Sequence, residues 1–121
     1  MRFRGGEVGG PETLVDADGV DAPGPFIGLM LAAGACAGSD VVSILEKMRV
    51  TLSEARIELV ASRRDEQPRR LTTLELIFHL RGDGLTAANA ERAVDLSVTK
   101  YCSVLASLAP DTIVRHAIRL G

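Results

Sequence analysis

The sequence contains little of what usually marks a function. It has no tryptophan, two cysteines and 3% aromatic residues in 121 residues. Its 16 acidic and 14 basic residues leave a formal charge of −2, and this balance argues against the strongly basic surface of a nucleic-acid-binding domain. The longest apolar run, residues 26–38, is shorter than the roughly 20 residues of a membrane-spanning helix. We therefore expect neither nucleic acid nor a membrane as a partner.

The size of the chain is enough for one core without disulfide staples. Hydrophobic residues make up 46% of the sequence, so leucine, valine, isoleucine and alanine must fill that core. Acidic residues precede the apolar run, whereas a secretion signal requires a positively charged segment there. We expect a single domain over residues 1–121 in the cytoplasm, where thiols stay reduced unless they are catalytic or act as sensors.

Hydrophobic periodicity predicts an α+β protein in the order ββ–α–ββ–α–β, with helices packed against an antiparallel sheet. Residues 16–19 are expected to form the turn of the first hairpin. The expected elements are a hairpin or edge segment over 1–24, a central helix over 25–49, a strand pair over 54–82, a second helix over 86–108 and a last strand over 111–120.

The two predicted helices differ in their apolar patterns. From Phe26 to Gly38 the central helix is apolar on every side, which predicts burial all round. Two helices and one sheet can hardly enclose such a helix, so we expect a homodimer. In the second helix, the apolar residues recur at three- and four-residue steps and place Tyr101 and Cys102 on its buried stripe.

The two cysteines, Cys36 and Cys102, are the candidate catalytic residues. Each one alone is most simply a small buried hydrophobe, but on two packed helices they could approach within disulfide distance. Burial raises a thiol pKa, and Asp40 one turn later is expected to raise that of Cys36 further. A reactive Cys36 then requires a cation from elsewhere in the chain, and Arg2 and Arg4 are the candidates.

Metal binding has no support from sequence spacing. His79 and His116 could join the cysteines in a Cys2His2 site, but the chain has no C-x-x-C or H-x-x-x-H pair. Phosphate-binding, dinucleotide-binding and nucleophile-elbow motifs are missing as well. We expect no bound metal or cofactor.

Several motifs together resemble the OsmC/Ohr family, the osmotically inducible protein C and organic hydroperoxide resistance proteins. Gly24-Pro25, an apolar helix reaching Cys36, and Asp40-Val-Val-Ser-Ile-Leu-Glu-Lys-Met-Arg49 are similar to its central helix. Arg81-Gly-Asp-Gly-Leu85 and Lys100-Tyr-Cys-Ser-Val104 are similar to its second cysteine region. The match covers nearly the whole chain, and the two cysteine motifs are its most specific part.

The resemblance implies an intertwined homodimer with active sites at the subunit interface. It also implies reduction of organic hydroperoxides, with Cys36 as the peroxidatic thiol, oxidised first, and Cys102 as the resolving thiol. An external dithiol, lipoyl-type or thioredoxin-like, would reset the disulfide.

One departure from the family pattern supports an alternative to the peroxidase function. The family often carries a glutamate one or two residues after the proline, which orients an arginine onto the thiolate. Phe26 and Ile27 occupy those positions here. The missing carboxylate favours a protein of the same fold that binds a small ligand or senses redox state with little peroxidase activity, whereas the retained cysteine pair favours the enzyme.

Overall fold

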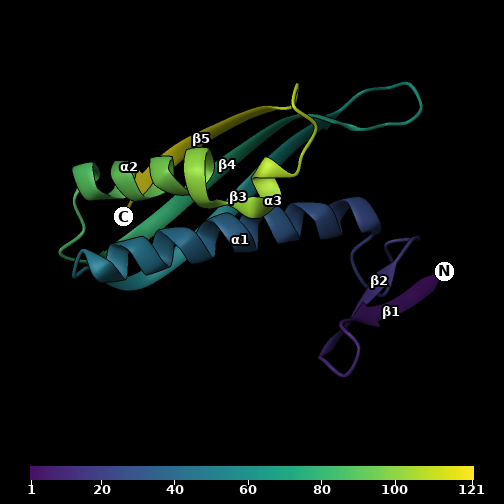
Figure 1. Cartoon of the computed structure of the whole chain (residues 1–121), viewed down its shortest axis with the longest axis horizontal. Coiled ribbons are helices and arrows are strands. Elements are labelled where there is room, and N and C mark those ends of the chain that lie inside the picture. The colour runs from purple at the N-terminus through teal and green to yellow at the C-terminus, as the bar shows by residue number, and fades with distance from the viewer. The chain divides into compact units, whose positions relative to one another are not determined.

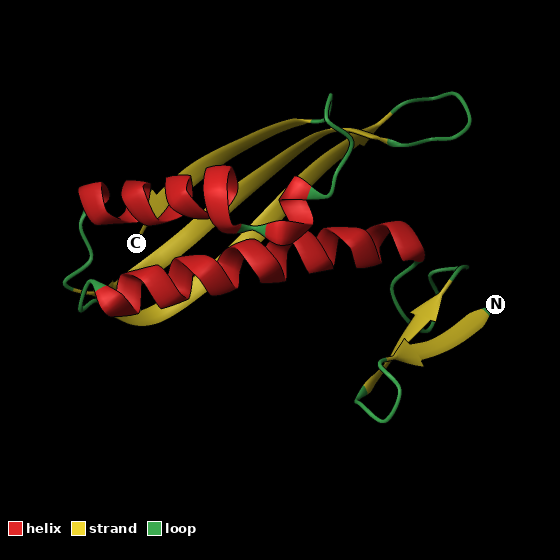
Figure 2. Ribbon diagram, in the orientation of Figure 1, coloured by secondary structure: helices red, strands yellow, loops and turns green.

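The computed structural model describes residues 1–121 and has the α+β architecture expected from the sequence (Figures 1 and 2). The chain forms two compact units, residues 1–32 and 33–121. Its elements are β1 (Arg2–Gly6), β2 (Glu12–Asp16), α1 (Pro25–Lys47), β3 (Thr51–Arg63), β4 (Leu71–Asp83), α2 (Ala87–Leu96), a π-helical segment η1 (Ser97–Tyr101), α3 (Ser103–Ala106) and β5 (Ile113–Leu120).

The first unit holds the hairpin of β1 and β2, which pair antiparallel from Arg2↔Asp16 to Gly6↔Glu12. The loop between these strands lies before β2, so the prediction that residues 16–19 form the hairpin turn is wrong. They follow β2 and lead toward α1, because the buried Asp16 carboxylate organises that segment: it accepts backbone N–H bonds from Asp18, Val20 and Asp21 at 3.0, 3.2 and 2.9 Å.

The second unit contains a three-stranded sheet in the order β3–β4–β5. β3 and β4 are antiparallel, but β4 and β5 are parallel, with Thr73 opposite Ile113 and Leu80 opposite Leu120. The expectation of an antiparallel sheet is therefore wrong for β5. The reason lies in the connection, because the helical segment between the two strands carries the chain back to the end of the sheet where β4 begins.

The core lies between this sheet and the helices, which cover one of its faces (Figure 1). The alternating residues Leu74, Leu76, Phe78 and Leu80 of the central strand β4 are at most 2% exposed, as their period of two predicts. Facing residues on α1 and α2 are equally buried: Ala33, Ala37, Val41, Leu45, Ala90, Ala93 and Val94. The sheet and α2 together thus hold α1 in a fixed place.

The packing of α1 on β3 depends on small residues. A Cβ atom on Gly34 would lie 2.9 Å from the Leu59 side chain, and one on Gly38 would lie 2.8 Å from that of Ile57. Both distances are too short for ordinary contact, so the glycines allow the helix and strand to approach closely. On another side of α1, Cys36 and Asp40 contact the segment that follows α2.

The helix α1 is long and apolar enough to cross a membrane by length and composition alone, with a mean hydropathy of 1.7 over its most apolar window. Core helices of soluble proteins and signal sequences pass the same test. In this single chain Ile27, Leu29 and Leu31 are 52%, 39% and 53% exposed, so burial of the helix on every side would need a partner chain and stays a prediction. These side chains lie at the N-terminal end of the helix.

The Asp16 carboxyl group provides a test of the first unit. Its backbone hydrogen bonds from Asp21 and Asp18 lower its pKa from the ordinary 3.8 to about 2. Because the folded-state pKa is the lower one, the stabilisation is complete above about pH 4 and is lost as the pH falls through about 2. Side-chain carboxyl NMR shifts should give a midpoint near 2 for Asp16. A midpoint near the ordinary value would contradict these hydrogen bonds.

Candidate functional site

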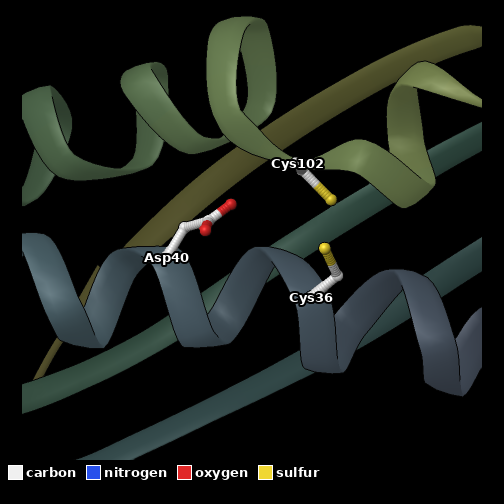
Figure 3. Close-up of side chains that lie close together, drawn as sticks. All are labelled: Cys36, Asp40 and Cys102. Atoms are coloured by element: carbon white, nitrogen blue, oxygen red, sulfur yellow. The ribbon is translucent and has the colours of Figure 1, made fainter.

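The structure brings the two predicted catalytic cysteines together within the second unit. Cys36 lies on α1 and is partly exposed, whereas Cys102 follows η1 and is 4% exposed. Their side chains point toward each other across the space between the two segments, with Asp40 beside them (Figure 3). The two Sγ atoms and a carboxylate oxygen of Asp40 all lie within 4.8 Å of one another.

The position of Cys102 depends on the π-helical turn of η1. The backbone N–H of Cys102 donates to the carbonyl of Ser97 at 2.9 Å, five residues back rather than the four of an α-helix. A π turn holds one residue more than the sequence pattern of an α-helix anticipates. Ala90, Val94, Cys102 and Leu105 are buried as the regular three- and four-residue steps predict, but Ser97 is buried in addition and Tyr101 is not.

Tyr101 shows the effect of this turn. The sequence placed it on the buried stripe beside the thiol, but it is 52% exposed and its ring lies 5.2 Å from the Lys100 ammonium. That prediction is wrong because the extra residue of the π turn rotates the chain after Ser97. Tyr101 faces away from the core, while Cys102 faces α1.

Ser97 is a site residue that sequence reasoning missed. Its side chain is fully buried, and its hydroxyl lies within hydrogen-bond distance of the Ala37 carbonyl, at 3.0 Å, and of Asp40 Oδ2, at 3.2 Å. These contacts fix η1 against α1 and orient the Asp40 carboxylate toward the thiols. The sequence signal was faint: a serine three residues after the buried Val94.

The Cys36 thiol is the more acidic of the pair. A backbone N–H bond from Val104 has the largest effect and lowers its pKa below the ordinary value, with a further contribution from the Cys102 thiol. Ser103 Oγ lies 3.8 Å from the Cys36 sulfur. We expected burial to raise this pKa unless a cation approached. The direction is opposite, because backbone donors of the segment after Cys102 stabilise the thiolate.

The Cys102 thiol has the opposite shift. Burial raises its pKa, since removal from water disfavours the thiolate, and the nearby Cys36 sulfur adds to this effect. The Leu105 N–H donates to its sulfur at 3.5 Å and offsets part of it. The site therefore holds one thiol biased toward the thiolate and one biased toward the neutral thiol.

The candidate arginines belong to the other compact unit. Arg2 and Arg4 both lie on β1, where Arg2 forms an ion pair with Asp21 at 3.1 Å. Their proposed role toward Cys36 stays a prediction. The histidines are not part of the cysteine cluster: His79 on β4 contacts Glu58 on β3 at 2.9 Å, and His116 lies on β5.

The opposite pKa shifts of the thiols give a pH test. In Cys102→Ser, the alkylation rate of Cys36 should rise with pH through a midpoint below the ordinary thiol value of 9.0. Cys102→Ala removes the neighbouring donor and should raise that midpoint. In Cys36→Ser, Cys102 should react with a midpoint above 9.0, because its burial remains. A bimane alkylation series measures all three, and midpoints in the reverse order would refute the assignment.

Known proteins share this fold and arrangement of the chain. The family described as OsmC-like protein matches residues 17–116. Protein YhfA of Escherichia coli is 39% identical over 118 residues, which cover 97% of this chain and 88% of that protein. A hypothetical protein from Aquifex aeolicus superposes with a TM-score of 0.81 at 26% identity, covering 100% and 95% of the two chains.

A more distant structure has the same fold. The organic hydroperoxide resistance protein OhrB of Bacillus subtilis superposes with a TM-score of 0.64 at 12% identity, over 98% of this chain and 96% of that one. The family match extends over most of the sequence, and the structural likenesses cover nearly all of it. The chain belongs to the OsmC family.

Proposed function

We propose that this protein is a thiol-dependent peroxidase that reduces organic hydroperoxides in defence against oxidative stress. The observation that carries the proposal is the pair of thiols whose sulfur atoms lie within 4.8 Å of each other, one with a lowered pKa and one with a raised pKa. Family membership is consistent with a redox role, and the fold is shared with a protein named for organic hydroperoxide resistance.

The proposed reaction has two steps. The Cys36 thiolate attacks the outer peroxide oxygen, which breaks the O–O bond, leaves a sulfenic acid on Cys36 and releases an alkoxide that takes up a proton to become the alcohol. The Cys102 thiol then attacks the sulfenic sulfur, forms the disulfide and releases water. The peroxide gains the two electrons that the two thiols lose.

The lower pKa of Cys36 suits it to the first step, because the thiolate is the nucleophile. The Val104 N–H supplies part of the stabilisation that an oriented arginine provides elsewhere in the family. Cys36 is also partly exposed beside the small residues Ala35 and Ala37, whereas Cys102 is buried. A peroxide therefore reaches Cys36 more readily.

Completion of the cycle requires an external reductant. We propose a dithiol partner, lipoyl-type or thioredoxin-like, which reduces the Cys36–Cys102 disulfide by thiol–disulfide exchange and leaves as a disulfide itself. This exchange fits a cytoplasmic location, where such dithiols are kept reduced.

The order of oxidation tests the enzyme. In Cys102→Ser treated with cumene hydroperoxide, a sulfenic-acid probe should label Cys36, because no resolving thiol remains. In Cys36→Ser, labelling of Cys102 should be slower by at least about tenfold, as expected for a buried thiol of raised pKa. The wild-type protein should lose both free thiols per equivalent of peroxide.

The outcomes separate the two functional classes. Equal labelling of both cysteines would contradict the assignment of Cys36 as the peroxidatic thiol and Cys102 as the resolving thiol. No labelling of either would eliminate the peroxidase and favour the alternative, an OsmC-fold protein that binds a small ligand.

We also propose that the protein is a homodimer. Its support is the exposed apolar surface of Ile27, Leu29 and Leu31 on α1, which is costly to leave in water. Light scattering at micromolar concentration should give twice the chain mass, and Leu31→Lys should shift the protein toward the monomer. Glu7→Lys, at an exposed polar position, is the matched control. A monomeric wild-type protein would contradict the proposal.

A further inference from the structure

We propose that the reduced protein binds a thiophilic divalent cation, with Zn²⁺ as the best fit, through Cys36, Asp40 and Cys102. Two thiolates and a carboxylate are ligands that zinc accepts. The proposal does not depend on peroxidase turnover: a protein inert toward hydroperoxides would still hold this donor set.

The geometry of the three donors is close to what the ion needs. Their ligand atoms lie within 4.8 Å of one another. With zinc–sulfur distances of about 2.3 Å and zinc–oxygen distances of about 2.0–2.2 Å, tetrahedral coordination separates ligand atoms by roughly 3.5–3.8 Å. Small rotations of the side chains are enough to close this difference, because all three already point into the same space (Figure 3).

The donors are held by two regular segments. Cys36 and Asp40 are four residues apart on α1 and so share one face of the helix. Cys102 faces them from the end of η1, where the π turn directs it toward α1. Spacing rules for zinc motifs search for pairs close in sequence and therefore miss a set completed by a residue from a distant segment.

The surroundings of Asp40 suit a ligand. Ser97, which is fully buried, lies with its hydroxyl 3.2 Å from Asp40 Oδ2. Carboxylates that bind a metal are usually hydrogen-bonded themselves, and the Ser97 hydroxyl is placed to donate such a bond, with the Ala37 carbonyl as its other acceptor at 3.0 Å. Arg56, Arg70 and Arg81 form ion pairs with Glu54, Glu58 and Asp111, so these three arginines do not compete with a cation for Asp40.

Three protein ligands leave one coordination position open, as in catalytic rather than structural zinc sites. Cys36 and Asp40 are partly exposed, which gives the ion a route in, while Cys102 closes the inner side. Both thiols must be reduced and must lose their protons on binding. Metal binding and disulfide formation therefore exclude each other at this site.

The test is a metal titration of the reduced full-length protein without hydroperoxide. Co²⁺ should give one equivalent per chain with a sulfur-to-cobalt charge-transfer band and tetrahedral visible bands, and Zn²⁺ should displace it. Each of Cys36→Ser and Cys102→Ser should abolish the charge-transfer spectrum of the two-thiolate site. Asp40→Asn should weaken zinc binding by at least about tenfold, and Ser97→Ala by about tenfold through loss of carboxylate orientation.

The matched control is Asp95→Asn, which removes an exposed carboxylate on α2 and should leave the affinity unchanged. Circular dichroism verifies folding of each variant, and if one fails to fold, the remaining variants still decide the matter. Absence of the charge-transfer band in the wild type, or equal affinity in Asp40→Asn and Asp95→Asn, overturns the proposal. Because the titration contains no peroxide, failure to bind metal would not contradict the proposed peroxidase. Failure of the sulfenic-acid labelling would likewise not contradict the proposed metal site.

Discussion

The buried hydroxyl of Ser97 ties together the two segments that carry the thiols. It contacts the Ala37 carbonyl and the Asp40 carboxylate on α1, while the Ser97 carbonyl accepts the Cys102 N–H at the end of the π turn. A fully buried polar group must find such partners, since an unsatisfied one costs about 1–3 kcal/mol. The contacts therefore fix η1 against α1 and hold the cysteines at close range.

The difference in acidity between the thiols follows from the same arrangement. Because the chain leaves η1 at Cys102 and begins α3 immediately, the N–H of Val104 is directed at the Cys36 sulfur. Cys102 itself lies on the inner side, where burial raises its pKa. One short stretch of backbone thus lowers the pKa of one cysteine and encloses the other. The pKa of Cys36 is therefore lowered by backbone groups, whereas Phe26 and Ile27, the two residues after Pro25, carry no carboxylate.

The position of α1 in turn depends on the sheet. Gly34 and Gly38 let the helix approach Leu59 and Ile57 on β3, while Cys36 and Asp40 face α3 and η1. The crossover from β4 through α2 to the parallel strand β5 then brings Cys102 over the same face. The site is therefore a product of the sheet topology as well as of the two cysteine motifs.

The sequence by itself determined the order of the elements and the buried face of β4, and it singled out the two cysteines as candidates, because each depends on local periodicity or on residue type. It was wrong where a distant contact decides the outcome. The parallel pairing of β5, the exposure of Tyr101 after the π turn and the buried role of Ser97 depend on how segments meet. The lowered pKa of Cys36 likewise comes from a backbone N–H far along the chain, and the Asp40 carboxylate joins the thiols only through folding. Local patterns record which face of a segment is apolar, but only the tertiary structure decides which groups meet across it.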